Sequence, residues 1–232
     1  MPHNQFSWFF STTAILATMF FIQHPIAAQD ETEVWDVTLA RGDTRDIDFE
    51  TEEGTWMSLD ISPDSQWVIF DLLAHVYRLP IAGGEAESLT QESGVSLNYH
   101  PKFSPDGTRI AFISDRAGQN NLWVMDADGS NPQQVQNSPE TRVTMPEWTA
   151  DGEYILVTQG GGIWMYHQDG GEGVEVVSSS DGSASWPSVS ADGQYVYYQV
   201  QTPGDPVPWI VDNFESGLVQ DALQGANNLS RM

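Results

Sequence analysis

A short turn motif that recurs at a nearly constant interval constrains this chain more than any other feature. Its best-preserved copy is Ser104-Pro105-Asp106-Gly107, which lies between Phe103 and a run of apolar residues at 110–113. Proline presets φ at the first corner of such a turn, and glycine supplies the positive φ where the chain reverses. Four copies of the motif place aspartates at intervals of 42, 45 and 41 residues, at Asp64, Asp106, Asp151 and Asp192.

A second marker keeps the same register. An aromatic residue follows each aspartate after 13, 17, 13 and 17 residues, at Tyr77, Trp123, Trp164 and Trp209. With the further turns between them, each unit accommodates about four short strands joined by hairpins. A period of about 40–45 residues with four strands per period is typical of β-propeller blades, each of which must stack on its neighbours to bury both faces. The pattern therefore predicts an all-β fold, a β-propeller of four-stranded antiparallel blades, with about four blades visible in an incomplete ring.

The expected domain limits follow from these repeats. The blades are predicted at about 56–98, 99–143, 144–185 and 186–211, so that the propeller repeats cover 56–211. Residues 29–55 contain alternating patterns at 34–39 and 46–50, which predict strands that could close the ring. Residues 212–232 have no clear periodicity and are expected to form an irregular tail. The next repeat aspartate would fall beyond the last residue, so we expect a truncated chain.

The first 28 residues are typical of a targeting segment. They contain no Asp, Glu, Lys or Arg, and an apolar run at 12–22 is followed by Ile26-Ala27-Ala28 and an acidic start. This pattern predicts a secretory signal peptide over 1–28, and hence a periplasmic or extracellular protein. An uncleaved membrane anchor is the alternative, although the apolar run is shorter than the roughly 20 residues that a spanning helix needs.

Charge and cysteine content exclude several functional classes. The chain has 33 acidic and 8 basic residues, a formal net charge of −25, and no cysteine. Nucleic acid and anionic lipid both require a basic surface, so neither is expected as a partner, and no membrane association is expected after signal cleavage. The absence of cysteine excludes disulfides, a thiol nucleophile and thiolate metal ligands.

The repeats resemble those of TolB-like, or WD-like, propellers. The resemblance rests on the Ser-Pro-Asp-Gly turns, on Asp115-Arg116, and on the run from Asn121 to Pro132. Segments at 53–60, 70–73 and 79–86 are also similar to one subgroup, in which a propeller precedes a metal-dependent amidohydrolase barrel in exported bacterial proteins. The general resemblance covers about 56–211 and the narrower one about 34–135. It implies a propeller domain whose enzymatic partner domain would hold the divalent metal.

Catalytic signatures are not found in the sequence. An amidohydrolase barrel needs a His-x-His pair with further His and Asp ligands, but His3, His24, His75, His100 and His167 do not have that spacing. We expect His75, His100 and His167 to be structural or at the surface. There is no Gly-x-Ser-x-Gly elbow and no phosphate-binding glycine loop. The repeat aspartates are interpreted as turn residues and the repeat aromatics as core residues. No catalytic, cofactor-binding or metal-binding residue is therefore predicted in this chain.

The sequence thus leads to a functional hypothesis with alternatives. We expect the non-catalytic propeller portion of an exported amidohydrolase-like protein, which acts as a scaffold, a substrate gate or an interaction surface. Its partner would be another protein or its own C-terminal domain. The first alternative is a free-standing periplasmic TolB-like propeller that binds a protein. The second is an enzyme in its own right, working at the channel of the propeller.

Overall fold

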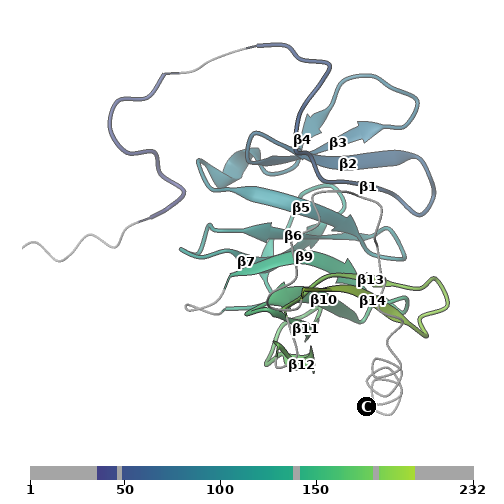
Figure 1. The fold of residues 1–232 in the computed structure, drawn as a ribbon. Helices are drawn as coiled ribbons and strands as arrows, with labels where there is room; N and C mark the ends of the chain where they lie inside the picture. The colour runs from purple at the N-terminus through teal and green to yellow at the C-terminus, as the bar shows by residue number, and fades with distance from the viewer. Residues whose placement is uncertain (1–35, 46–48, 138–141, 180–182, 202–232) are drawn as a thin grey trace, which may run out of the picture. The chain divides into compact units, whose positions relative to one another are not determined.

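The computed structural model describes residues 36–45, 49–137, 142–179 and 183–201, and within them every regular element but one is a β-strand. The strands form four consecutive antiparallel sheets (Figure 1). The first sheet contains β1 (Leu59–Ile61), β2 (Trp67–Leu72), β3 (His75–Pro80) and β4 (Glu87–Ser88), in that order. The second contains β5 (Asn98–Phe103), β6 (Arg109–Ser114), β7 (Asn121–Asp126) and β8 (Gln133–Gln134). A single turn of 3-10 helix, η1 (Gln91–Ser93), lies between them.

The third sheet contains β9 (Val143–Trp148), β10 (Tyr154–Gln159), β11 (Gly162–His167) and β12 (Val174–Val177). The described part of the fourth consists of β13 (Ser183–Val189) and β14 (Val196–Gln201). Strand order equals chain order in every sheet, and the first strands β1, β5, β9 and β13 contact one another in sequence. This is the arrangement of successive propeller blades, so the predicted all-β, incomplete β-propeller fold is confirmed.

The turn between the first and second strands has the same hydrogen bonds in all four sheets. A hydroxyl group donates to the aspartate Oδ1 over 2.6 Å in each copy, in the pairs Ser62–Asp64, Ser104–Asp106, Thr149–Asp151 and Ser190–Asp192. The same Oδ1 accepts the backbone N–H two residues further on, at 3.0–3.1 Å. The aspartate therefore closes its own turn, as short polar side chains do at chain reversals.

The glycines of these turns lie against the preceding blade. A Cβ on Gly107 would lie 3.3 Å from Pro63 Cδ, and one on Gly152 would lie 3.5 Å from Pro105 Cδ. Both glycines have a positive φ. Ser65 takes the place of glycine in the first turn and has a φ of +56°, so the first turn has the same conformation as the others. A non-glycine residue is strained in that conformation. The turns of neighbouring blades therefore nest in series.

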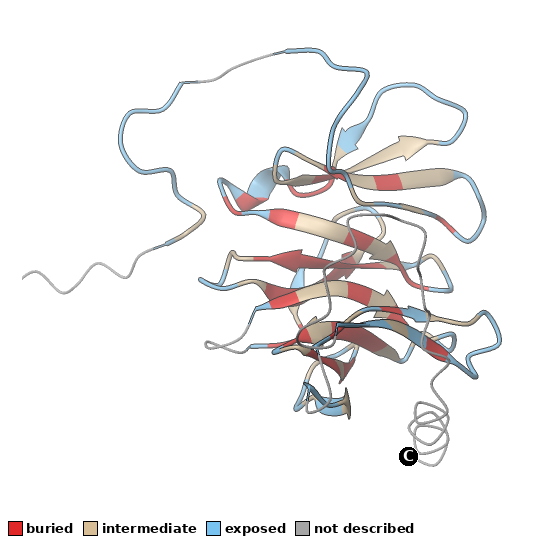
Figure 2. Ribbon diagram, in the orientation of Figure 1, coloured by how far each residue is buried: buried red, intermediate tan, exposed pale blue. Residues whose placement is uncertain are grey.

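Three hydrophobic clusters fill the spaces between neighbouring sheets (Figure 2). Alternate residues of β6 face opposite neighbours: Ile110 and Phe112 pack against the first sheet, whereas Ala111 and Ile113 pack against the third. A strand that is covered on both faces has apolar residues at consecutive positions, which explains the apolar run at 110–113 in β6. On the first sheet, Leu59 and Ile61 of β1 remain exposed.

The N-terminal strand expected over 34–39 is not formed in its described part. Residues 36–39 form a turn, in which Asp36 Oδ1 accepts the Thr38 N–H at 2.9 Å and the Thr38 hydroxyl at 2.7 Å. An Asp side chain that bonds the backbone two residues on competes with strand pairing, which explains the difference. The predicted signal peptide, the tail at 212–232 and part of the segment at 46–50 lie outside the described residues.

Candidate functional site

The residues singled out by the repeat pattern lie in two separate places. Asp64, Asp106, Asp151 and Asp192 occupy the hairpin turns described above. The aromatics Tyr77, Trp123 and Trp164 lie on the third strands β3, β7 and β11, and Trp209 lies outside the described residues. Trp123 and Trp164 pack against hydrophobic clusters, whereas Tyr77 stacks on Phe70 with ring centroids 5.6 Å apart. Of the turn aspartates, Asp106 and Asp151 line a common hollow of about 520 Å³ together with Arg109.

A buried carboxylate links the first two blades where their first strands begin. Asp71, on β2, accepts the Ser58 N–H with Oδ1 at 2.9 Å and the His100 N–H with Oδ2 at 2.8 Å. Asp71 is 8% exposed. A carboxylate whose two oxygens each bond a backbone donor is a strong link, because hydrogen bonds to a charged group are worth more than neutral ones. Asp71 thus fixes the entry to β5 relative to the first sheet.

His100 continues this link to the third blade. Its ring Nδ1 lies 3.4 Å from the backbone nitrogen of Met145, which donates to it. An accepting Nδ1 places the ring proton on Nε2 and requires the neutral imidazole. Burial lowers the pKa of His100, and the nearby Asp71 carboxylate opposes that shift only in part. The structure therefore places His100 in a structural role, between Asp71 and the strand β9.

A row of alternating charges lies further along the same first strands. Lys102 Nζ is 3.9 Å from Asp60 Oδ1 and 3.5 Å from Glu147 Oε2, so it lies between the first and third blades. Asp60 Oδ2 accepts the Phe103 N–H at 2.8 Å. Burial raises the pKa of Glu147, and the Lys102 ammonium limits the rise. Each of these charged groups thus joins one blade to the next.

His100 belongs to a repeated backbone feature that the sequence analysis did not use. His100, Met145 and Trp186 have φ of +53°, +54° and +59°, and each precedes a proline at a register shift in its sheet. All three lie six residues before a repeat aspartate, so the x-Pro spacing was a signal for this bulge. The first repeat has Ser58-Leu59 at that place. A bulge of this kind re-aims side chains along a strand.

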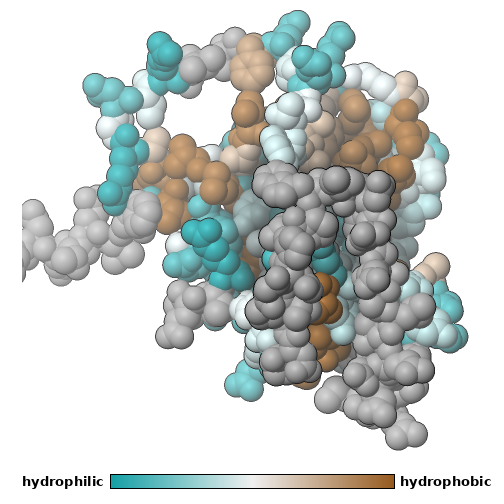
Figure 3. All heavy atoms as spheres, in the orientation of Figure 1, coloured by the Kyte–Doolittle hydropathy of each residue, from teal (hydrophilic) through white to brown (hydrophobic). Residues whose placement is uncertain are grey.

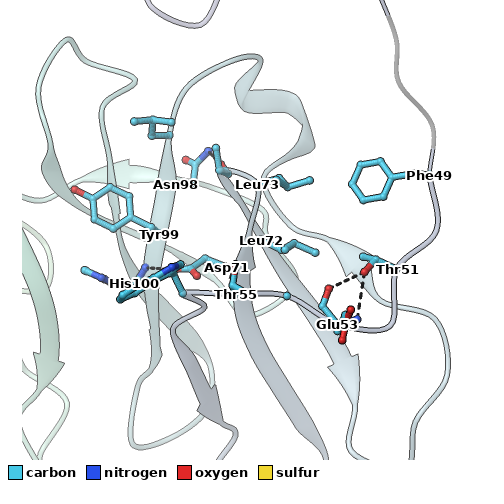
Figure 4. Close-up of a pocket in the computed structure, with 14 residues that line it drawn as sticks. Phe49, Thr51, Glu53, Thr55, Asp71, Leu72, Leu73, Asn98, Tyr99 and His100 are labelled. Carbon is cyan, nitrogen blue, oxygen red and sulfur yellow. Dashed lines mark hydrogen bonds between the residues drawn. The ribbon is translucent and has the colours of Figure 1, made fainter. Parts of the chain in front are cut away.

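A hollow of about 510 Å³ opens beside His100, between the first sheet and the start of β5 (Figure 4). Its floor contains Asp71 and His100. Its rim comes from three segments: residues 49–56, the β2–β3 turn at 72–74, and residues 97–99. The Asp115-Arg116 pair holds the last of these, because Asp115 Oδ1 accepts the Leu97 N–H at 2.8 Å and Arg116 donates to Asn98 Oδ1 at 2.8 Å.

The rim of this hollow is largely apolar. Figure 3 shows hydrophobic residues grouped on the first sheet and on the loop that leads into β5. Phe49, Trp56, Leu73 and Leu97 line the hollow and are all more than 45% exposed. Such a volume, with an apolar lining and a few polar groups, is in the range of pockets that bind small ligands or short chain segments.

Neither end of the first strands has the donor set of a metal centre. Within the described ranges, no three His, Asp or Glu side chains lie close enough together to hold a metal ion. The same part of the chain contains no helix long and apolar enough for a bilayer span. Asp60 and Asp71 bond backbone groups of the second blade, and Lys102 pairs with carboxylates of the first and third blades, so these polar groups position strands.

Comparison with known proteins agrees with this architecture. Residues 29–229 match the TolB beta propeller domain, which is most of the chain. The chain belongs to the TolB β-propeller domain family. The described sheets are therefore blades of this propeller, and the Asp-Gly turns are its repeated turn.

Individual relatives match over shorter stretches. Tricorn protease homolog 1 of Streptomyces coelicolor is 30% identical over 99 residues, which cover 43% of this chain and 9% of that protein. The uncharacterized peptidase YuxL of Bacillus subtilis is 44% identical over 66 residues, which cover 28% of this chain and 10% of that protein. The match thus spans about a tenth of either relative. The structure of a putative TolB from Agrobacterium tumefaciens has a TM-score of 0.55 at 20% identity, over 64% of this chain and 55% of that one, and it supports the fold alone.

Proposed function

We propose that this TolB-like propeller is the non-catalytic portion of an exported amidohydrolase-like protein, in which it acts as a scaffold and interaction surface. The observation that carries the proposal is the use made of its charged groups. Asp60, Asp71 and Lys102 each bond or pair with a neighbouring blade where the first strands meet. Groups committed in this way hold a platform together, and they are not free to transfer protons or to bind a metal.

The wider setting is proposed on three grounds. The relatives named above are called a protease homolog and a peptidase, which supports a propeller that accompanies a hydrolase. The amidohydrolase assignment rests on the sequence resemblance over 34–135. Export to the periplasm or the outside of the cell rests on the pattern of residues 1–28. Any divalent metal would then belong to the enzymatic domain.

Two experiments test this proposal. The purified chain, with added Zn²⁺ or Mn²⁺, is assayed against a panel of amide and peptide substrates, and we expect no turnover above buffer. Metal-dependent hydrolysis that is lost with a chelator would overturn the non-catalytic role. Sequencing the gene beyond the codon for Met232 then separates the two settings. A reading frame that continues into a His-x-His barrel supports the amidohydrolase setting, whereas a stop codon supports the free-standing periplasmic propeller.

A further inference from the structure

We propose that the hollow between the first sheet and β5 binds a peptide segment of a partner in which an arginine or lysine adjoins an apolar residue. This inference rests on the proposed role as an interaction surface and names the chemistry that the surface recognises. We call this hollow the β2–β5 pocket, and its rim is the set formed by 49–56, 72–74 and 97–99. Three features of the rim support the proposal: its backbone strain, its exposed apolar side chains and its charge.

Backbone strain is concentrated at this pocket. Eight non-glycine residues have a positive φ in the described part of the chain, and four of them line the pocket: Trp56, Leu73, Ala74 and His100. The φ of His100 belongs to the repeated bulge, so the strain particular to the pocket is that of the other three. A non-glycine residue in the left-handed region costs on the order of 1–2 kcal/mol, so such residues persist where the surroundings or a function require them.

In the β2–β3 turn the strain comes from the residues and not from the backbone conformation, which the third blade shares. The equivalent turn of the third blade, between β10 and β11, has Gly160 and Gly161 at the two positions with positive φ. The first blade instead has Leu73 and Ala74 there. Leu73 is 65% exposed, so no hydrophobic core compensates its strain. Its side chain is presented to solvent at the rim, which is the position of a contact residue.

Trp56 adds a second exposed apolar contact. It is 100% exposed, and it lines the pocket on the segment that also carries Glu53. Within that segment, the Thr51 hydroxyl donates to the Glu53 carbonyl at 2.6 Å and accepts the Glu53 N–H at 3.2 Å. Exposed aromatic residues are typical of recognition surfaces, because they bury a large area for little conformational entropy.

The charge of the pocket selects a cationic occupant. None of the described residues that line it is Lys or Arg. Asp71 is already bonded to two backbone donors, whereas the Glu53 side chain is exposed at the rim. The net charge of −25 adds an attractive field for cations and repels acidic peptides. A guanidinium or ammonium group can lie on the Trp56 ring beside Glu53, while its apolar neighbour contacts Leu73.

Titration calorimetry with matched peptides tests this inference on the 232-residue chain. The probe is the peptide acetyl-Gly-Phe-Arg-Leu-Gly-amide, and its control has Glu in place of Arg. We expect the Arg peptide to bind at least tenfold more tightly than the Glu peptide, with an affinity that falls as salt is raised. Equal affinities of the two peptides, or no binding of the Arg peptide, would overturn the inference.

Substitutions then locate the binding site. Glu53→Gln is expected to lower the affinity for the Arg peptide at least threefold. Glu85→Gln, at an exposed carboxylate outside the pocket, is expected to leave that affinity unchanged. Leu73→Gly is the sharper variant: it removes strain and a contact together, so the melting temperature should rise while the affinity falls at least threefold. A rise in melting temperature with an unchanged affinity would contradict the inference.

The same samples separate failure of this inference from failure of the proposed function. Mass spectrometry of the peptides after titration reports whether they are intact. Intact peptides that do not bind overturn only the peptide-binding inference. Cleavage of the Arg peptide, lost on addition of a chelator, overturns the non-catalytic role itself.

Discussion

The two ends of the first strands differ in how uniform they are from blade to blade. At the end where each strand enters the Asp-Gly turn, the hydroxyl–aspartate bond has the same length in all four sheets. At the opposite end, Ser58 stands where the later blades have His100, Met145 and Trp186. The acceptors of the links between blades differ as well: the His100 N–H donates to the Asp71 carboxylate, the Met145 N–H to the His100 ring and the Trp186 N–H to the Thr158 hydroxyl. A feature repeated without change serves the propeller as a whole. A hollow of about 520 Å³ also lies between the Asp106 and Asp151 turns, but the β2–β5 pocket lies at the end where the blades differ.

The largest expected effect is at the variable end. Asp71→Ala removes the acceptor of two backbone N–H groups in a buried place, and we expect the free energy of unfolding to fall by about 3 kcal/mol. Urea unfolding followed by tryptophan fluorescence measures this loss. Asp43→Ala removes an exposed carboxylate and is the control, with an expected change within about 0.5 kcal/mol. Similar midpoints for the two variants would show that Asp71 is not a structural link.

Substitutions at the uniform end should lower the free energy of unfolding by less, and the loss should depend on how deeply the turn is buried. Ser104 Oγ donates to Asp106 and accepts the Arg109 N–H at 2.9 Å, and Ser104 is 3% exposed. Ser104→Ala leaves that N–H without its acceptor, so we expect a loss of about 2 kcal/mol in urea unfolding.

The last blade provides the comparison for Ser104. Ser190 makes the same bonds in the fourth turn but is less buried, so water can replace the lost hydroxyl. Ser190→Ala should therefore cost about half as much as Ser104→Ala. Equal losses in the two turns would mean that the turn hydrogen bonds act independently of burial.

A pair of reciprocal substitutions tests the strain within the uniform end. Gly107→Ser places a side chain at a φ of +71° and near Pro63, and we expect a loss of about 1.5 kcal/mol. Ser65→Gly relieves the same conformation in the first turn, and part of its gain is offset by the greater freedom of glycine in the unfolded chain. We expect Ser65→Gly to stabilise by about 0.5 kcal/mol in thermal unfolding. A destabilised Ser65→Gly variant would show that Ser65 has a role beyond the turn.

The same contrast explains how much could be predicted from the sequence. The Asp-Gly turn is local, so the residues that close it lie within six positions, and their repetition was enough to predict the fold. The variable end is built by contacts between residues far apart in sequence. Asp71 reaches His100 and Asp60 reaches Phe103, over 29 and 43 residues, and no periodicity reports such pairs.

Two local sequence patterns show where prediction from the sequence fails. The x-Pro spacing marked the strand bulge at His100, but its meaning depended on knowing that first strands of neighbouring blades meet. At 36–39 the alternating pattern predicted a strand, and the turn formed because Asp36 bonds Thr38. Hydrophobic alternation is thus reliable where a neighbouring sheet covers the strand, as at β6, and weak where a side chain offers the backbone another partner.

The smallest expected effect is a pH dependence at the variable end. Because the folded state holds the pKa of His100 below its ordinary value of about 6.5, the unfolded chain binds the extra proton first as pH falls. The contribution of neutral His100 to stability is therefore complete above pH of about 6.5 and is lost as pH falls through the lowered pKa. Melting temperatures between pH 7.5 and 5 should thus fall more steeply for the wild type than for His100→Asn, a residue that tolerates the left-handed backbone. Met145→Leu keeps the N–H that donates to Nδ1, so its slope should match the wild type. Parallel pH profiles for the wild type and His100→Asn would place the acid sensitivity elsewhere, and His100 would then link the blades without responding to pH.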